Sequence, residues 1–154
     1  MEKSLKARAV ELLSRREYSR RELQQRLKPH AENPEEIEAV LTELAERHWQ
    51  SDERFAGQFA EVKGRRWGSR RLTQALREKG VDKDTIACAI ENHDDLAVAS
   101  DVWQRKFGSL PQTQQEKAKQ MRFLAARGFP MDVISKVLSG CALDDFAGDD
   151  DSND

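Results

Sequence analysis

A repeated apolar pattern constrains the fold of this chain more than any other feature. Seven pairs of apolar residues stand 49 positions apart, and five further pairs stand 62 positions apart. The first set is Val10/Phe59, Leu13/Val62, Tyr18/Trp67, Leu23/Leu72, Leu27/Leu76, Ile37/Ile86 and Leu41/Ile90, and the second is Phe59/Met121, Val62/Leu124, Trp67/Phe129, Leu72/Ile134 and Leu76/Leu138. Each copy spaces its apolar residues as one face of a helix does. A repeat of this length predicts tandem helical units.

Local signals place the helix boundaries within each copy. Ser19 with Glu22 forms the sequence of a capping box, and Pro34 after Asn33 suits a first helical position. Gly80 suits the left-handed residue that ends a helix. No segment alternates with a period of two, so we expect an all-α chain.

We therefore expect three tandem three-helix repeats in an elongated, curved array, because stacked helical units build long surfaces. Their expected boundaries are 1–48, 49–92 and 93–140, with the second repeat basic. Residues 141–154 lack helical periodicity and form an acidic tail that we expect to be disordered.

Three aromatic residues occupy matching places in the two offsets. These residues are Tyr18, Trp67 and Phe129, and we interpret them as the core anchors of their repeats. Base stacking by Trp67 is the functional alternative, and we prefer the core role. Cys88 lies among Ala and Ile residues, which predicts a small core residue.

The motifs of common enzyme classes are missing from the sequence. His30, His48 and His93 stand apart, without the local spacing of a zinc site. Neither a phosphate-binding loop nor a Gly-x-Ser-x-Gly turn occurs. We expect a protein that is not an enzyme and has no metal or cofactor. The sequence has no stretch of about 18 apolar residues and no apolar run near Met1, so we expect a cytoplasmic protein.

The charges are unevenly distributed along the chain. The net charge is -2, but six Asp and no basic residue follow Ser139, and the rest of the chain carries +4. Seven basic residues against two acidic ones lie between Glu61 and Gly80. The candidate binding residues are Lys63, Arg65, Arg66, Arg70, Arg71, Arg77 and Lys79, with Arg20 and Arg21 at the matching turn of the first repeat.

Clustered Arg side chains bind phosphates or carboxylates through a bidentate fork. The simpler alternative is a solvated face that balances Glu61 and Glu78. We prefer a binding surface, because four Arg within seven residues exceed what solubility needs. For the Asp-rich tail we prefer a role in solubility over competition with an acidic partner for the basic residues.

These residues resemble the RecX family of bacterial RecA regulators, from about Ala7 to Leu138. The resemblance rests on the order and spacing of several short segments. They are 12–16 (LLSRR), 18–23 (YSRREL), 51–56 (SDERFA), 68–72 (GSRRL), 79–81 (KGV), 122–124 (RFL), 127–129 (RGF) and 133–138 (VISKVL).

The resemblance implies binding along the helical groove of the RecA filament on single-stranded DNA. It further implies inhibition of strand exchange, ATP hydrolysis and repressor cleavage, and so a damping of recombination and the SOS response. We separately expect the chain to be a monomer. Two other functions stay open on the residues alone. One is a sequence-independent DNA-binding protein that acts through the basic middle repeat, and the other is a transcription regulator that reads bases with residues 69–79.

Overall fold

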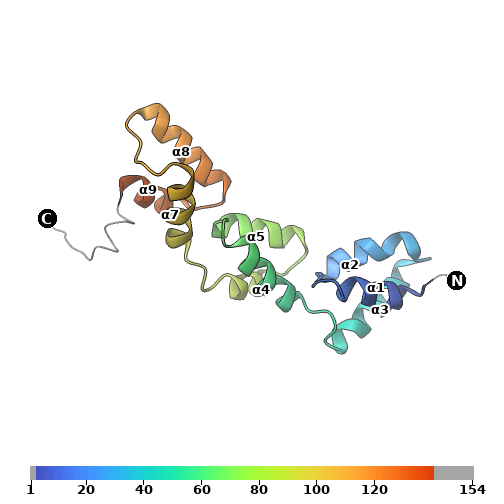
Figure 1. The fold of residues 1–154 in the computed structure, drawn as a ribbon. Coiled ribbons are helices and arrows are strands. Elements are labelled where there is room, and N and C mark those ends of the chain that lie inside the picture. The colour runs from blue at the N-terminus through green and yellow to red at the C-terminus, as the bar shows by residue number, and fades with distance from the viewer. Residues whose placement is uncertain (1–2, 141–154) are drawn as a thin grey trace. The chain divides into compact units, whose positions relative to one another are not determined.

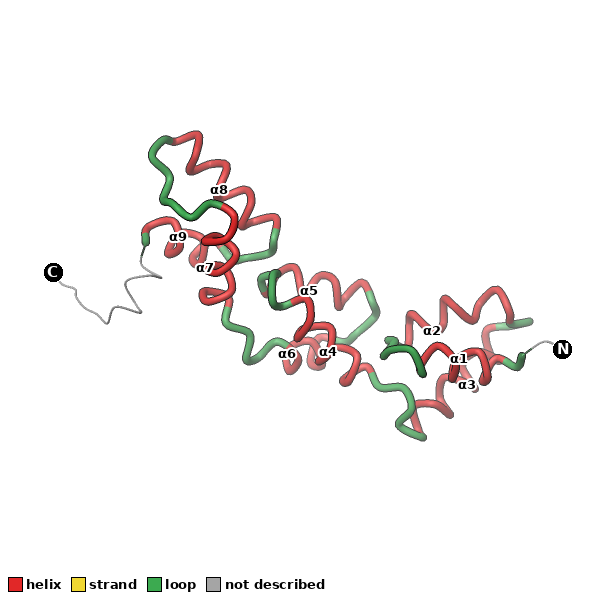
Figure 2. The backbone as a smooth tube through the Cα atoms, viewed as in Figure 1, coloured by secondary structure: helices red, strands yellow, loops and turns green. Residues whose placement is uncertain are grey.

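The computed structural model describes residues 3–140, and all regular structure among them is helical (Figure 2). Nine α-helices and one short 3-10 turn follow one another in these residues (Figure 1). They are α1 (Leu5–Leu13), α2 (Arg20–Leu27), η1 (Lys28–His30), α3 (Pro34–Glu46), α4 (Asp52–Lys63), α5 (Ser69–Glu78), α6 (Lys83–Ala89), α7 (Asp95–Lys106), α8 (Gln114–Ala126) and α9 (Met131–Ser139). The predicted all-α fold of three helix triplets is confirmed. The acidic tail lies outside the described residues.

Side-chain caps begin most of these helices, as the sequence predicts. The Ser19 hydroxyl accepts from the N–H of Glu22, whose carboxylate accepts from the N–H of Ser19, which completes the capping box. Asn33 caps α3 ahead of Pro34. Gly80 has a φ of +83°, as expected for a left-handed helix terminator.

Contacts divide the described residues into two compact units. Unit 1 comprises residues 3–60 and 75–89, and unit 2 comprises residues 61–74 and 90–140. Helices α4 and α5 therefore each contribute residues to both units. The boundaries of the units differ from those of the predicted three-helix repeats, because residues 52–60 and 75–89 of the middle triplet group with unit 1 and residues 61–74 with unit 2.

The first and third triplets each bury an apolar cluster. Helices α1–α3 enclose Ala9, Tyr18, Leu23, Leu27, Ile37, Leu41 and Leu44, whereas α7–α9 enclose Ala99, Val102, Trp103, Leu124, Phe129, Ile134, Val137 and Leu138. Each fully buried Leu contributes roughly 1.5–3 kcal/mol of transfer free energy. Trp103 and Gln120 add a buried hydrogen bond, in which the indole Nε1–H donates to the amide Oε1 at 2.8 Å.

The repeat spacing of 62 residues predicted from the sequence aligns the wrong helices, because it is displaced by one helix. It pairs α4 with α8, whereas α8 ends at Gly128 (φ +92°) as α5 ends at Gly80 (φ +83°). Matching these two glycines gives an offset of 48 and pairs Val81 with Phe129 and Ile86 with Ile134, all of them buried. Phe129 therefore does not correspond to Tyr18. The error arose because every amphipathic helix repeats the same i, i+3, i+4 spacing.

Cys88 is exposed, contrary to the core role predicted for it. Helix α6 is short and buries Ile86. Two residues along an α-helix are a turn of about 200°, so Cys88 lies on the opposite face from Ile86. Apolar neighbours in the sequence do not by themselves place a residue inside a helical protein.

Candidate functional site

The predicted basic residues belong to both compact units. Unit 1 holds Arg20, Arg21, Arg77 and Lys79, and unit 2 holds Lys63, Arg65, Arg66, Arg70 and Arg71. Each unit therefore has its own set of basic residues, and the two sets differ in whether their side chains form ion pairs with carboxylates.

In unit 1, two of the predicted binding residues form ion pairs. The Nζ atom of Lys79 lies 3.0 Å from Oε2 of Glu22, and Nη2 of Arg20 lies 2.8 Å from Oε1 of Glu38. The main chain of Lys79 is also engaged, because its carbonyl oxygen accepts from the Ser19 hydroxyl at 2.8 Å. The two contacts of Lys79 connect the end of α5 to the start of α2, whereas the Arg20 pair connects α2 to α3. Both side chains therefore stabilise the fold as well as carrying charge.

Glu22 is the half-buried carboxylate that contacts both Lys79 and the start of α2. Burial by itself raises the pKa of Glu22, but hydrogen bonds from the Ser19 N–H, Lys79 and Arg16 outweigh burial and lower the pKa below 4.5. The ionised form of Glu22 thus holds together two segments that are far apart in the sequence.

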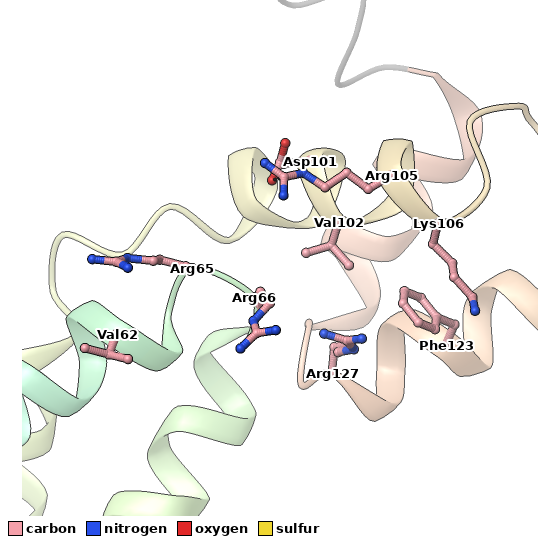
Figure 3. A pocket seen from close by; sticks show the side chains of 9 residues that line it. All are labelled: Val62, Arg65, Arg66, Asp101, Val102, Arg105, Lys106, Phe123 and Arg127. Atoms are coloured by element: carbon pink, nitrogen blue, oxygen red, sulfur yellow. Dashed lines mark ion pairs between the residues drawn. The ribbon is translucent and has the colours of Figure 1, made fainter.

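In unit 2, an open cavity of about 800 Å³ gathers basic residues from three segments (Figure 3). Its lining is Val62, Arg65, Arg66, Asp101, Val102, Arg105, Lys106, Phe123 and Arg127. We call this the basic groove. Five of the nine lining residues are cationic and one is anionic, so the groove suits a negatively charged ligand.

The cations of the basic groove differ in their partners. Arg105 pairs with Asp101 on the same helix, with Nε 3.3 Å from Oδ2. Within residues 3–140, no ion pair joins Arg65, Arg66, Lys106 or Arg127 to a carboxylate. These four side chains can therefore accept an external anion without first breaking an ion pair between described residues.

An aromatic ring supports two of the groove's cations. The Phe123 ring centroid lies 4.9 Å from Cζ of Arg127 and 5.6 Å from Nζ of Lys106. Cation–π contacts of this kind hold a guanidinium in place and leave its outer N–H groups available. Figure 3 shows Arg66 and Arg127 from different segments beside the same opening.

The sequence predicted only part of this groove. Arg65 and Arg66 were among the candidate residues, whereas Arg105, Lys106 and Arg127 were not. The missed residues stand at the ends of α7 and α8, where a basic residue also fits the helix dipole. Arg127 lies in the RGF segment at 127–129, which the sequence analysis had already singled out. Because Arg66 is far away in the sequence, nothing there indicated that the two Arg side chains lie close together.

Hydrogen bonds between α5 and its neighbours fix the walls of the groove. The N–H of Gly68 donates to the carbonyl oxygen of Arg127 at 2.7 Å, and the N–H of Arg70 donates to that of Gly128 at 3.0 Å. The loop that carries Arg65 and Arg66 is thereby held next to the end of α8. These backbone hydrogen bonds fix the positions of two of the segments whose side chains line the groove.

Lys63, Trp67 and Arg71 form a second cationic cluster in unit 2. Cζ of Arg71 lies 4.0 Å from the Trp67 ring centroid, and Nζ of Lys63 lies 5.3 Å from it. Trp67 is half-buried, unlike Tyr18 and Phe129, which are buried. Trp67 therefore departs from the predicted role of a buried core anchor, although cations lie over the Tyr18 ring as well.

Asp95 caps α5 from the first helix of the next triplet. Its carboxylate accepts from the Ser69 N–H at 2.8 Å and from the Ser69 hydroxyl at 2.5 Å. Nε2 of His93 lies 3.3 Å from Oδ1 of Asp95, without hydrogen-bond geometry. Because the Ser69 hydroxyl donates to the carboxylate and has no basic nitrogen to accept its proton, this group is a structural cap rather than an activated nucleophile.

The same capping arrangement occurs in unit 1. Asp52, the first residue of α4, accepts from the N–H of Arg20 at 2.9 Å and from the Gln50 side chain at 3.0 Å. Both Asp52 and Asp95 open the first helix of a triplet and cap the second helix of the triplet before it. A carboxylate at a helix N-terminus accepts a hydrogen bond from an otherwise unpaired N–H. Its negative charge also interacts favourably with the positive end of the helix dipole.

Residues 3–140 contain no group of three or more His, Cys, Asp and Glu side chains placed to hold a metal ion. No helix in the same range combines the length and apolar character that crossing a bilayer requires.

Comparison with protein families matches all three helix triplets. The RecX first three-helix domain matches residues 6–44, the second matches 51–90 and the third matches 93–138. The chain belongs to the RecX family. This assignment pairs α4–α6 with α7–α9, as do the left-handed glycines that end α5 and α8.

Relatives named Regulatory protein RecX match this RecX-family chain over most of its length. The protein of Chromobacterium violaceum is 60% identical over 147 residues, which cover 96% of this chain and 97% of the relative. A Neisseria meningitidis protein is 46% identical and covers 89% of this chain and 90% of its own. The Ralstonia nicotianae protein is 42% identical and covers 92% of each.

Solved RecX structures share the fold at low sequence identity. The crystal structure of RecX from Lactobacillus salivarius is 17% identical, with a TM-score of 0.72 over 90% of this chain and 95% of that one. A second crystal structure of regulatory protein RecX is 19% identical, with a TM-score of 0.74 over 88% of this chain and 73% of that one. The helical RecX fold is therefore retained where most side chains have changed.

Proposed function

We propose that this RecX-family chain regulates the RecA recombinase by binding RecA filaments on single-stranded DNA. Binding inhibits strand exchange, ATP hydrolysis and the stimulation of repressor cleavage, and so damps homologous recombination and the SOS response. The chain acts as a cytoplasmic monomer. The observation that carries this proposal is the match of all three RecX domains along the chain.

The basic groove supplies a chemical reason for binding. Its Arg side chains carry rigid donor forks that fit carboxylates on a protein surface or phosphates on DNA. Arg65, Arg66 and Arg127 have no carboxylate partner among the described residues, so no ion pair there has to break first. The cluster of Lys63 and Arg71 on Trp67 extends the cationic surface of the same unit.

A repeating partner suits a chain with repeated binding units. After one unit binds a filament, the next contact is intramolecular and has a high effective concentration. The chain then favours a filament over separate RecA subunits. A regulator that binds one filament state more tightly than another shifts the filament population towards that state.

A second function is favoured specifically by the groove's charge. The same cations could bind the backbone of bare DNA without reading its sequence. Such binding weakens steeply with salt, because each neutralised phosphate releases counterions. The proposal of a RecA regulator and this alternative differ in whether the target is the filament or the DNA itself.

The deciding experiment measures the DNA-dependent ATPase rate of RecA with this protein added far below the RecA concentration. Single-stranded DNA is in excess over both proteins, so competition for bare DNA cannot inhibit. We expect strong inhibition at a molar ratio well below one. Undiminished ATPase activity together with tight binding to bare DNA would replace the proposed function with the DNA-binding alternative.

A further inference from the structure

The C-terminal segment carries an unusual charge for its length. Residues 141–154 hold six Asp and no basic residue, and the segment follows Gly140 at the end of α9. The six are Asp144, Asp145, Asp149, Asp150, Asp151 and Asp154. Helix α9 belongs to unit 2, which also contains the basic groove.

The net charge of unit 2 is opposite in sign to the charge of residues 141–154 and nearly equal to it in size. Twelve basic and seven acidic residues give residues 61–74 and 90–140 a net charge of +5, against -6 for the Asp residues of the segment. Of the nine ion pairs that join Lys or Arg to a carboxylate among the described residues, eight lie in unit 1 and one in unit 2. The cations of unit 2 thus have few internal partners, whereas those of unit 1 are largely paired.

The segment is long enough to reach any part of unit 2. Fourteen residues span up to about 45–50 Å when extended. A folded unit of about 65 residues has a radius of gyration of about 11 Å. A covalent connection of this length gives the charged groups of the segment an effective concentration on the order of millimolar at the groove.

We infer that the basic groove binds the aspartate-rich C-terminal segment of the same chain. The carboxylates of residues 144–154 occupy the positions between Arg65, Arg66, Lys106 and Arg127. Each exposed pair contributes only about 0.2–1 kcal/mol, so the bound segment exchanges rapidly and salt weakens it. A polyanionic partner displaces the segment, whereas a single small anion does not. This inference is independent of the proposed action on RecA.

Carbodiimide coupling of the full chain tests this contact directly. The reagent joins a carboxylate to a neighbouring lysine amine through an amide bond, with loss of water through the activating reagent. Lys106 is the lysine that lines the groove, and it is exposed. Lysine–glutamate ion pairs such as Lys79–Glu22 also couple, so the products that contain residues 141–154 are compared. Among these we expect the main product to link Lys106 to an aspartate of the segment, and we expect about 1 M NaCl to reduce its yield at least fivefold.

Variants separate groove binding from random encounter. The double change Arg66→Glu and Arg127→Glu should lower the Lys106 product at least fivefold, whereas Arg122→Glu, at an exposed position of α8, should change it less than twofold. A product spread evenly over Lys117, Lys119 and Lys136, or unaffected by the groove variant, overturns the inference.

Nuclear magnetic resonance supplies a second test that does not depend on lysine chemistry. Amide signals of Arg66, Phe123 and Arg127 should differ between the full chain and a chain with all six segment Asp changed to Asn. Signals of α2 and α3 serve as the control and should coincide. A dT oligonucleotide that binds the groove with equal affinity in both chains would mean that the groove is open, which overturns the inference.

Discussion

The main-chain N–H of Gly68 donates a hydrogen bond to the carbonyl oxygen of Arg127 at 2.7 Å. This bond connects the start of α5 to the end of α8 across 59 positions of sequence. It holds the loop of Arg65 and Arg66 beside Arg127, and so brings together cations of the basic groove that come from separate segments. The groove depends on how closely these two backbones approach.

Gly128→Ala should disturb that approach strongly. A Cβ atom at position 128 would clash with Cβ of Arg71 and lie 2.5 Å from its backbone N, at a φ of +92° that disfavours any L side chain. We expect a loss of about 2 kcal/mol or more in the free energy of unfolding, measured by urea denaturation.

Gly57→Ala is the matched control for this change. Position 57 lies inside α4, and a Cβ atom there meets nothing within 4 Å. The same chemical change should stabilise the chain by about 0.5–1 kcal/mol, because alanine favours a helix. Equal effects at positions 57 and 128 would contradict the close approach.

Asp95→Ala should weaken the start of α5. The change removes the acceptor for both the N–H and the hydroxyl of Ser69. We expect a loss of about 1–2 kcal/mol in the free energy of unfolding. Asp132→Ala, an exposed first-turn aspartate of α9, should cost less than about 0.7 kcal/mol. Faster hydrogen exchange confined to the first turn of α5 would locate the effect.

Glu22→Gln should remove a stability that depends on pH. Hydrogen bonds lower the pKa of Glu22 below 4.5 in the folded chain, so its ionised form adds stability above that pH. This stability is lost as the pH falls through the lowered value. At pH 7 we expect a cost of about 1–2 kcal/mol, and the difference from the parent chain should shrink towards pH 3.

Urea denaturation at pH 7 and pH 3 measures this difference. Glu46→Gln at an exposed position of α3 is a suitable comparison, with an expected change within about 0.5 kcal/mol. A Glu22→Gln cost that is the same at both pH values would show that the carboxylate charge is not responsible.

Charge reversal at Arg70 and Arg71 should weaken inhibition of RecA while the fold is retained. Both side chains are exposed, although Arg71 also covers Trp67. We expect the double Glu variant to need at least tenfold more protein for half-inhibition of the ATPase. Helical circular dichroism and the unfolding midpoint control for folding. Unchanged inhibition by a folded variant would remove these residues from the proposed binding surface.

Local features of this fold were predictable from the sequence because they depend on neighbouring residues. The capping box at Ser19, the N-cap at Asn33 and the left-handed Gly80 each need only a few adjacent positions. The helix count and the all-α class follow from the same signals. The boundaries at 48/49 and 92/93 remain our proposal for where one repeat ends and the next begins.

The groove was harder to predict because its residues come from three separate segments. Arg66 and Arg127 stand 61 positions apart, and their segments meet through backbone hydrogen bonds from Gly68 and Arg70 to the end of α8. The exposure of Cys88 was missed for a related reason, since composition around a residue does not fix its helical face. Lys79 was counted as a binding residue, but its partner Glu22 becomes visible only in the fold.

The caps from Asp52 and Asp95 run in one direction along the chain, from each triplet back to the one before it. Helix α8 has no later triplet among residues 3–140, and it begins with its own cap, in which Thr113 accepts from the N–H of Glu116 at 3.1 Å. A nonsense mutation just before codon 95 would therefore destabilise a helix that precedes the truncation. Helix α5 would be translated in full but would lack the Asp95 carboxylate that caps its first turn.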